Sequence, residues 1–274
     1  MNIKAYTLGA VMTVSSATAF ADKHIDQSTR LLNSIQTGDQ AAASVINPNK
    51  YIQHNLMVAD GIAGFGALLK TLPKDSARVH VVRAFRDGNY VFTHTEYNFF
   101  GPKIGFDIFR FENGKIVEHW DNLQETAVKP SPGGHSMIDG PTKAVDPEKT
   151  EANKMLVHDF LQKVWVEGDS KALSKYIDGE RYVQHNPMIG DGVSGLNKAM
   201  KNMAEQGMTV KFDKVHQVLG QGNFVLAVTE GKFGDKPASY YDLFRVQSGK
   251  IVEHWDTIET IPPQSEWKNP NGKF

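Results

Sequence analysis

An internal repeat constrains the fold of this chain more than any other feature of its sequence. The segment Tyr-Ile-Gln-His-Asn at residues 51–55 recurs as Tyr-Val-Gln-His-Asn at residues 182–186. Farther along, residues 113–121 and 248–256 both end in Gly-Lys-Ile-Val-Glu-His-Trp-Asp. The spacing between the copies stays nearly constant, so insertions fell in loops. Such self-similarity indicates two copies of one fold.

The length of the chain, 274 residues, suits two domains of about 100 to 150 residues each. A stretch rich in proline and glycine separates the two copies and reads as a linker. The organisation that we expect is a signal peptide (1–21), a first module (22–126), a linker (127–148), a second module (149–262) and a C-terminal tail (263–274).

Hydrophobic periodicity predicts the same order of elements in both copies. Apolar residues at helical spacing predict a helix over residues 156–165 that Gly168 ends, with a shorter counterpart around residues 31–35. Further helices are expected over residues 40–45, 61–72, 170–176 and 192–206. Period-two runs at residues 79–85, 90–99, 106–112 and 115–121 predict strands joined by hairpin turns. The fold class is therefore α+β, with helices on one face of a curved antiparallel sheet and an apolar pocket between them.

The first 21 residues resemble a secretory signal. A lysine precedes an apolar stretch of small residues, and Ala19-Phe20-Ala21 matches an A-x-A cleavage site. We expect cleavage after Ala21 and a periplasmic or secreted protein, with an uncleaved anchor or a cytoplasmic terminus as the alternatives. The absence of cysteine suits an oxidising compartment. The segment is too short and too polar to predict membrane association after cleavage.

Charge and motifs exclude several classes of function. Thirty basic against thirty-one acidic residues leave no basic excess for binding phosphate backbones, so we expect no nucleic-acid partner. The sequence lacks a complete dinucleotide-binding loop, a Walker sequence, an H-E-x-x-H helix and a cysteine nucleophile. We expect no cofactor. A metal held by His54, His94, His119 and a carboxylate has no diagnostic spacing, and we expect none.

Two residues of the first copy suit acid/base chemistry. Strand alternation places Asp107 on one face with Phe109, and burial there would raise the pKa of the carboxyl and make it a general acid. His54 is the candidate base, because a neutral imidazole can remove a proton beside a carbonyl. On the next strand, alternation puts His119 and Asp121 on one face. It puts Ile116, Glu118 and Trp120 on the other.

Simpler roles stay open for each of these residues. His54 could cap a helix or bind a loop, and Asp107 could form an ion pair with Arg83 or Arg110. His119 and Asp121 could be a structural couple, and the tryptophans Trp120 and Trp255 could only pack.

Each module resembles the SnoaL-like polyketide cyclases of the NTF2-like superfamily. The resemblance rests on the order of the helices, the Gln-His-Asn segment, the strand Gly-Phe-Asp-Ile-Phe-Arg at residues 105–110 and the Gly-Lys-Ile-Val-Glu-His-Trp-Asp segment. The resemblance spans nearly all of both modules. It implies two tandem cone-shaped α+β barrels with apolar pockets, and intramolecular aldol chemistry without metal or cofactor.

Ketosteroid isomerase shares this superfamily, and the comparison implies the roles of individual residues. His54 takes the place of the catalytic carboxylate base, a departure that changes the expected substrate, and Asp107 matches the oxyanion-stabilising acid. His119, Asp121 and Leu123 would point into the pocket, and Trp120 would point away. His94 adds a polar candidate that module two replaces by valine, so module one is the expected catalyst. The residues expected to bind ligand are Phe109, Leu123, His185, Asp242, His254 and Asp256.

Three functions follow as alternatives. The first is cofactor-independent enolisation, aldol-type cyclisation or isomerisation of a small hydrophobic carbonyl compound, by a lyase or an isomerase. The second is a carrier or sensor of a small apolar molecule. The third is an assembly module whose sheet backs form an intramolecular pseudo-dimer or a homo-oligomer.

Overall fold

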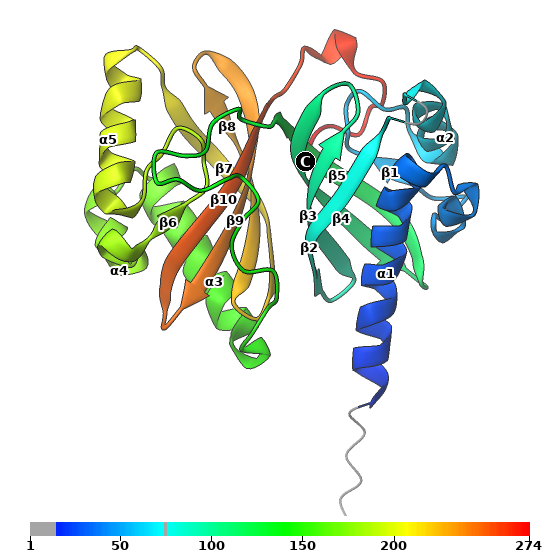
Figure 1. The fold of residues 1–274 in the computed structure, drawn as a ribbon, viewed down its shortest axis with the longest axis horizontal. Coiled ribbons are helices and arrows are strands. Elements are labelled where there is room, and N and C mark those ends of the chain that lie inside the picture. The colour runs from blue at the N-terminus through cyan, green and yellow to red at the C-terminus, as the bar shows by residue number, and fades with distance from the viewer. Residues whose placement is uncertain (1–14, 74–75) are drawn as a thin grey trace, which may run out of the picture.

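Two five-stranded sheets form the centre of the molecule, one in each module (Figure 1). The computed structural model describes residues 15–73 and 76–274. The strand order is β1-β5-β4-β3-β2 in module one and β6-β10-β9-β8-β7 in module two. In each sheet the four long strands form an antiparallel meander, and a two-residue strand pairs in parallel with the last of them. The α+β class with two tandem modules, predicted from the sequence, is confirmed.

The elements follow each other in the same order in both modules. Module one contains α1 (Ser15–Thr37), a 3-10 turn (Gln40–Val45), β1 (Ile52–Gln53), α2 (Gly61–Thr71), β2 (Arg78–Asp87), β3 (Tyr90–Asn98), β4 (Pro102–Glu112) and β5 (Lys115–Glu125). Module two contains α3 (Thr150–Phe160), α4 (Leu173–Tyr176), β6 (Val183–Gln184), α5 (Gly192–Glu205), β7 (Val210–Gln221), β8 (Phe224–Phe233), β9 (Lys236–Gln247) and β10 (Lys250–Thr260). A π-helical turn, Leu161–Val166, extends α3, where the sequence predicts one continuous helix.

The hairpin turns explain why the meander forms where it does. Between β4 and β5, Asn113 and Gly114 have φ angles of 50° and 74°. Ser248 and Gly249 repeat this geometry in module two, with 51° and 72°. Two consecutive positive φ values match the right-handed twist of the flanking strands and favour asparagine and glycine.

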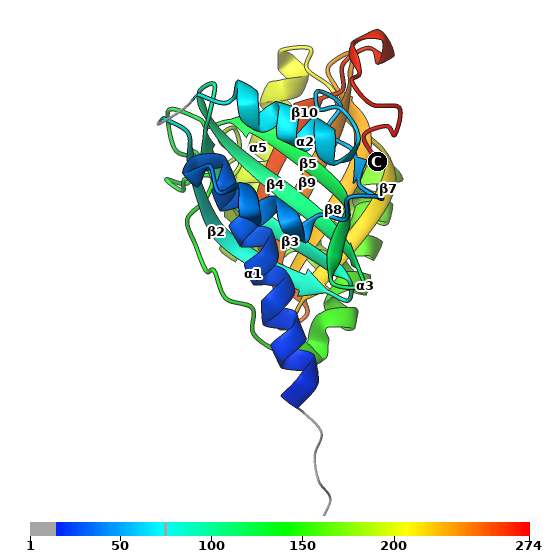
Figure 2. The ribbon, with the colours of Figure 1, turned by 90° about the vertical axis from the view of Figure 1, so that its right-hand side faces the viewer.

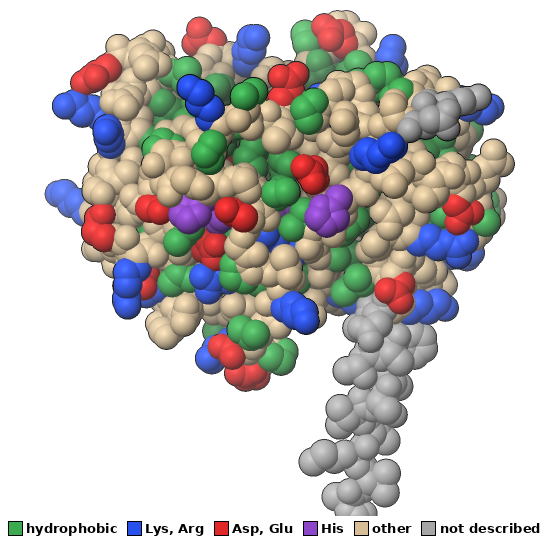
Figure 3. All heavy atoms as spheres, in the orientation of Figure 1, with side chains coloured by type: hydrophobic (Ala, Val, Ile, Leu, Met, Phe, Trp, Pro, Cys, Tyr) green, Lys and Arg blue, Asp and Glu red, His purple; other side chains and the backbone are tan. Residues whose placement is uncertain are grey.

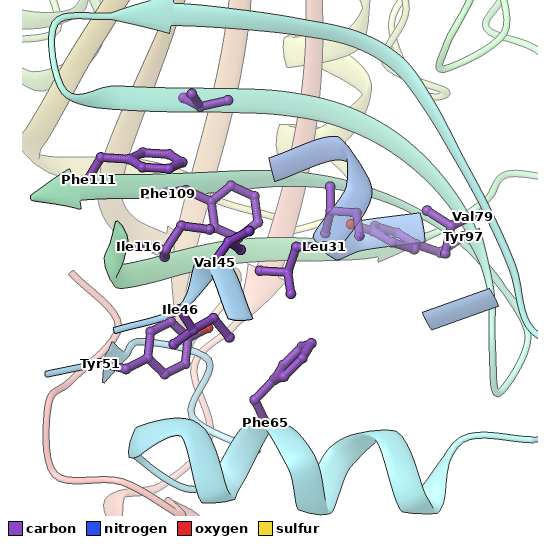
Figure 4. Packing of buried hydrophobic residues seen from close by; sticks show 12 residues of the cluster. Leu31, Val45, Ile46, Tyr51, Phe65, Val79, Tyr97, Phe109, Phe111 and Ile116 are labelled. Atoms are coloured by element: carbon purple, nitrogen blue, oxygen red, sulfur yellow. The ribbon is translucent and has the colours of Figure 1, made fainter. Parts of the chain in front are cut away.

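The helices cover one face of each sheet, its inner face, and the core of each module lies between the helices and this face (Figures 1 and 2). In module one, Leu31 of α1, Phe65 of α2 and Phe109 of β4 belong to one buried cluster. Figure 4 shows Phe65 pointing from α2 toward the sheet. Module two has an equivalent cluster around Phe160, Tyr176 and Phe244.

The backs of the two sheets face each other and join the modules. Phe85, Phe106 and Trp120 of module one share a buried cluster with Phe224 and Trp255 of module two. At its centre, Asn122 Nδ2 donates to the backbone oxygen of Thr257 at 2.8 Å and to its hydroxyl at 3.0 Å. Asn122 and Thr257 occupy equivalent positions on β5 and β10, so the chain forms a pseudo-symmetric pair of modules.

The described part of the N-terminal region belongs to α1. Residues 1–14 of the expected signal peptide lie outside the described residues, and Ser15 to Ala21 belong to α1. His24, on the same helix, stacks on Phe111 of the sheet at 4.1 Å. Within the described ranges, no helix has the length and apolar character that a membrane span requires. On the face in Figure 3, acidic and basic side chains alternate, in keeping with the net charge of −1.

Candidate active site

Each module holds the same three polar side chains on the inner face of its sheet. These are Asp107, His119 and Asp121 in module one, and Asp242, His254 and Asp256 in module two. Within each group, ligand-type atoms from all three residues lie within 4.8 Å of one another, and all six residues are buried. The sheet register produces this arrangement, since the two aspartates are direct cross-strand partners in both modules.

The short first strand orients the histidine of each group. In module two, Gln184 of β6 pairs with His254 of β10, and its Oε1 lies 3.0 Å from His254 Nδ1. The backbone N–H of Asn186 donates to the same Oε1 at 2.9 Å, which fixes the orientation of the amide. His254 Nδ1 therefore carries the proton, and Nε2 faces Asp242 Oδ1 at 2.9 Å. Gln53, Asn55 and His119 repeat this network in module one.

The group in module two lines a cavity of about 340 Å³, a volume typical of small-molecule sites. Its acidic and imidazole side chains are Asp242, His254 and Asp256, and its amides are Gln184, Asn186 and Asn197. The rest of the wall is largely apolar and comes from the π-helical turn, α5 and the sheet: Phe160, Val164, Trp165, Leu196, Met200, Met203, Phe212, Tyr240 and Ile258.

Burial in this cavity separates the protonation behaviour of the two aspartates. Desolvation raises the pKa of Asp242 well above its ordinary value. Desolvation also raises the pKa of Asp256, to about 6, while the charges of the neighbouring histidines and the hydrogen bond from Asn186 oppose the increase. The same burial lowers the pKa of His254 to about 4. Burial thus favours the neutral form of all three groups, and a pKa of about 6 still leaves Asp256 largely ionised near neutral pH.

Each aspartate of module two keeps one oxygen available. Asn186 Nδ2 donates to Asp256 Oδ2 at 2.6 Å, and His254 faces Asp242 Oδ1. The other oxygens, Asp256 Oδ1 and Asp242 Oδ2, have no hydrogen-bond partner among the described residues. Buried polar atoms rarely stay unpaired, so these two mark where a ligand or water would bind.

In module one the oxygen that corresponds to Asp242 Oδ2 is engaged, whereas Asp121 Oδ1, like Asp256 Oδ1, has no hydrogen-bond partner among the described residues. Tyr97 donates its hydroxyl to Asp107 Oδ2 at 2.5 Å, and Thr93 lies 3.4 Å from the same atom. Module two has Gly231 and Ala227 at the positions of Tyr97 and Thr93, because the β8 and β9 register is the same. These replacements remove both donors and leave Asp242 Oδ2 free.

Each module has a tyrosine near its first aspartate, but on different strands: Tyr97 on β3 and Tyr240 on β9. In module one Tyr97 packs over Gly105, where a Cβ would lie 3.1 Å from its ring. In module two a tyrosine, Tyr240, occupies the position of Gly105 and lines the cavity. Gly231 cannot carry a side chain, since a Cβ there would lie 1.9 Å from the backbone oxygen of Lys211.

The cavity found in module one is a different space. It measures about 640 Å³ and lies between the end of α1 and α2, with Ile35, Phe65 and Leu69 in its wall. The residues lining it do not include Asp107, His119 or Asp121. The sequence analysis favoured module one as the catalyst; the geometry favours module two, because its polar group and cavity coincide.

His54 and His185, the candidate base and its counterpart, lie apart from these groups. His54 Nε2 lies 3.0 Å from Glu118, and the ring stacks on Trp120 at 4.7 Å. His185 repeats this arrangement, stacked on Trp255 at 4.6 Å. Both belong to the back of the sheet, so the structure brings neither together with the aspartates.

The other candidates fall on both sides of the sheet. His94 is buried at the back, stacked on Phe106 at 4.3 Å, and is not a pocket residue. Phe109 stacks on His119 at 4.8 Å inside the core of module one. Leu123 packs against the same core. Trp120 points away from the pocket and into the interface between modules, as the resemblance implied.

A β-bulge changes one predicted face. The register of β4 and β5 shifts between Arg110 and Phe111, so Ile116 opposes Phe111 while Glu118 opposes Arg110. Ile116 therefore joins the inner core, and strict alternation placed it wrongly on the back.

Sequence reasoning missed the amides and tyrosines that hold these groups. Gln184 and Asn186 stand in the repeated Gln-His-Asn segment, so the repeat marked them, although attention went to the histidine between them. Tyr97 carried no signal, because its contact with Asp107 depends on strand pairing.

Both groups are organised for hydrogen bonding. Their carboxylates and imidazole are types of group that can coordinate a divalent cation. In both modules, however, each ring nitrogen of the histidine already faces an oxygen of the protein, at 2.9 to 3.1 Å. The expectation that the protein uses no metal and no cofactor stays a prediction.

No family model matches this chain, and no curated protein matches it. Solved structures resemble it in fold. An NTF-2 like protein of unknown function from Burkholderia xenovorans is 20% identical, with 40% of this chain and 88% of that chain covered and a TM-score of 0.35. TsrD from Streptomyces laurentii is 18% identical, with 38% and 89% covered and a TM-score of 0.33. An LEH-like epoxide hydrolase from M. tuberculosis is 16% identical, with 38% and 84% covered and a TM-score of 0.33.

Other matching structures are described by name as candidate polyketide cyclases and a candidate ketosteroid isomerase. These are the kinds of protein that the sequence resembles. In length, the covered share of this chain corresponds to one of its two modules.

Proposed function

We propose that module two binds a small, largely apolar carbonyl compound and catalyses proton transfer on it without a cofactor, as an isomerase or an aldol-type cyclase does. The observation that carries this proposal is the pair of adjacent buried aspartates in the wall of one cavity, each with one oxygen that has no hydrogen-bond partner among the described residues. Pairs of titratable groups whose pKa values are pushed apart by their environment are the usual basis for acid and base roles.

In this mechanism Asp256 is the general base. Its Oδ1 takes a proton from the carbon beside the carbonyl, so a C–H bond breaks and an O–H bond forms. The electron pair moves toward the carbonyl oxygen, which becomes an enolate. A pKa of about 6 keeps Asp256 ionised at neutral pH and still basic enough to act. Asn186 holds the other carboxylate oxygen and fixes the direction of attack.

Asp242 is the acid that stabilises the enolate oxygen. Burial raises the pKa of this carboxyl and so favours its neutral form, which has a proton to donate. The neutral carboxyl can donate this proton to His254 Nε2, since Nδ1 already donates to Gln184. A ligand oxygen competes with His254 for the same proton. The proton on Asp256 then returns to carbon, and the reaction is redox-neutral.

The apolar wall supports the carrier alternative as well. Met188, Met200 and Met203 line the cavity, and flexible thioether side chains adapt to ligands of different shape. A carrier would bind the same class of molecule and would not exchange its protons. The assembly alternative concerns the backs of the sheets. These surfaces already join the two modules of this chain.

Proton exchange in D₂O tests this function. Purified protein is incubated with hydrophobic ketones and β-dicarbonyl compounds, and NMR follows deuteration beside the carbonyl. The matched variants are Asp256→Asn and Asp121→Asn, which change equivalent residues of the two modules. We expect catalysed exchange that falls about 100-fold or more in Asp256→Asn and stays near wild type in Asp121→Asn. A ketone that binds in module two without exchange supports the carrier.

We also propose that the chain is exported, on the basis of residues 1–21. Mass spectrometry of the mature protein from its native host tests this, with an N-terminus at Asp22 as the expected result. An intact N-terminal segment in the cell extract contradicts it.

A further inference from the structure

The segment that follows each sheet crosses to the other module. The linker after module one runs along module two, and the C-terminal tail after module two crosses to module one (Figures 1 and 2). The tail lies along the segment after β1: Lys268 donates its N–H to Leu56 O at 2.8 Å, and Asn269 Nδ2 donates to Val58 O at 2.9 Å. The two segments are exchanged reciprocally.

Their contacts correspond one by one. Gly272 O lies 2.9 Å from His54 Nδ1, and Ser136 O lies 2.7 Å from His185 Nδ1. One residue earlier, Asn271 binds Asp60 at 2.9 Å, and His135 binds the equivalent Asp191 at 3.1 Å.

Two residues after Gly272 and Ser136, each segment returns to its own module's side of the interface. Phe274 stacks on His216 of β7 at 4.1 Å, and Ile138 O accepts from Arg83 of β2 at 2.6 Å. These contacts align Lys273 with Met137.

This aligned position carries opposite chemistry in the two modules. Lys273 is 3% exposed, and its Nζ lies 3.7 Å from Asp121 Oδ1 and 2.9 Å from Glu259 Oε2. Met137, at the equivalent step of the linker, is also buried, and its thioether carries no charge. An ammonium ion therefore sits beside the second aspartate of module one, while module two has an apolar side chain at that step.

We propose that the residue at this step of each exchanged segment, Lys273 or Met137, determines which module is competent for proton transfer. Lys273 places a positive charge 3.7 Å from Asp121 Oδ1. Met137, at the equivalent step, is uncharged and supplies no counter-ion to module two. Both are positioning residues, and the inference rests on the proposed role of Asp256 as the base.

The titratable groups around the two aspartates are shared only in part: Asp107, His119 and Tyr51 near Asp121 correspond to Asp242, His254 and Tyr182 near Asp256. Near Asp256 they are Asp242, His254, His185, Tyr182 and Tyr240. Near Asp121 they are Asp107, His119, Tyr51, Tyr97, Tyr241, Glu259 and Lys273. The lysine is the cation that module one adds.

Carboxyl ¹³C NMR titration of the full chain tests the proposal without any need for turnover. In Lys273→Met we expect the titration midpoint of Asp121 to rise by at least about one pH unit, since an opposite charge within about 4 to 6 Å lowers a carboxyl pKa by about 1 to 3 units. Glu259→Gln is the control, because it removes the other partner of Lys273 and leaves the ammonium beside Asp121; no rise is expected there.

The converse change is Met137→Lys, with Met137→Leu as its apolar control. We expect the Asp256 midpoint to fall by at least about one pH unit in Met137→Lys alone, and the acidic limb of any catalysed exchange to move with it. If Met137→Lys does not fold, Lys273→Met decides. An unchanged Asp121 midpoint in a natively folded Lys273→Met overturns the inference. Shifted midpoints without any catalysed exchange contradict the proposed function and leave the electrostatic role of this step intact.

Discussion

Asp242 and Asp256 face each other as direct cross-strand partners on β9 and β10, so their carboxyl groups stand side by side in the wall of the module-two cavity. Two carboxyls in a low-dielectric site do not ionise together easily. The pair therefore has a preferred state with one proton. The same burial that prepares the pair for proton transfer therefore lowers the stability of the fold when Asp256 is ionised.

Replacement of Asp256 by asparagine tests how much the buried carboxylate lowers the free energy of unfolding. The pKa of Asp256 is raised from its ordinary value to about 6, so its contribution to stability is complete below about pH 4 and is lost as pH rises through 6. At one pKa unit per 1.36 kcal/mol, the ionised carboxylate costs up to about 3 kcal/mol at pH 8. An asparagine can still accept the hydrogen bond from Asn186.

We therefore expect the free energy of unfolding of Asp256→Asn, measured by urea denaturation, to exceed that of the wild type by about 1 to 3 kcal/mol at pH 8. At pH 4 the two should differ little. Asp121→Asn is the control, since Asp121 has a lysine partner and should lose stability instead. Equal destabilisation in both variants would contradict the desolvation of Asp256.

The pH dependence of proton exchange follows from the same groups. Exchange should increase as pH rises through about 6, because Asp256 becomes ionised. It should decline at higher pH, where Asp242 loses the proton that its raised pKa retains. His254, with a pKa near 4, stays neutral over this range. Initial rates of deuteration between pH 4 and 10 test this. A profile that depends only on a group with a pKa near 4 would contradict the assignment of Asp256 as the base.

Tyr97 offers a test of the difference between the two modules at the first aspartate. Its hydroxyl donates a hydrogen bond to the buried carboxyl of Asp107, and Tyr97→Phe removes this hydrogen bond. We expect a loss of about 1 to 3 kcal/mol in the free energy of unfolding, measured by urea denaturation. The control is Tyr240→Phe in module two, whose hydroxyl donates to the backbone oxygen of Lys232 instead. A smaller effect in Tyr97→Phe than in Tyr240→Phe would argue against a structural role for the Asp107 group.

Much of the fold followed from the sequence, because it depended on local patterns that recur. The repeat fixed the number of modules, and the Asn-Gly and Ser-Gly turns fixed the hairpins. Alternation correctly placed His119 and Asp121 on one face of β5, and Asp107 and Phe109 on one face of β4. His54 was misplaced because its orientation depends on Trp120 and Glu118, which meet it only through the parallel pairing of β1 with β5.

The choice of module could not be read from the sequence for a similar reason. The exchange of Tyr97 and Gly105 for Gly231 and Tyr240 is visible in an alignment of the two copies. Its consequence for Asp242 requires the register of β8 and β9. The contact of Lys273 with Asp121 joins residues far apart in the chain, and no local pattern marks it.

Treatment with a chelator tests the expectation of metal-free chemistry. Both ring nitrogens of His254 already face oxygen atoms of Gln184 and Asp242. We expect EDTA to leave proton exchange and thermal stability unchanged, and added Zn²⁺ to inhibit by competing for the aspartates. Exchange that disappears with EDTA and returns with a divalent cation would contradict the proposed proton-transfer pair.

Removal of the last seven residues tests the exchange of segments between modules. The tail binds the backbone of Gln53, Asn55 and Leu56, and Gly272 O lies against His54. A chain that ends at Trp267 loses these contacts in module one and leaves the linker on module two intact. We expect faster amide hydrogen exchange at residues 51–60 than in the full chain, with residues 182–191 unchanged. Equal acceleration in both segments would mean that the tail stabilises the whole molecule through the interface and does not act on module one alone.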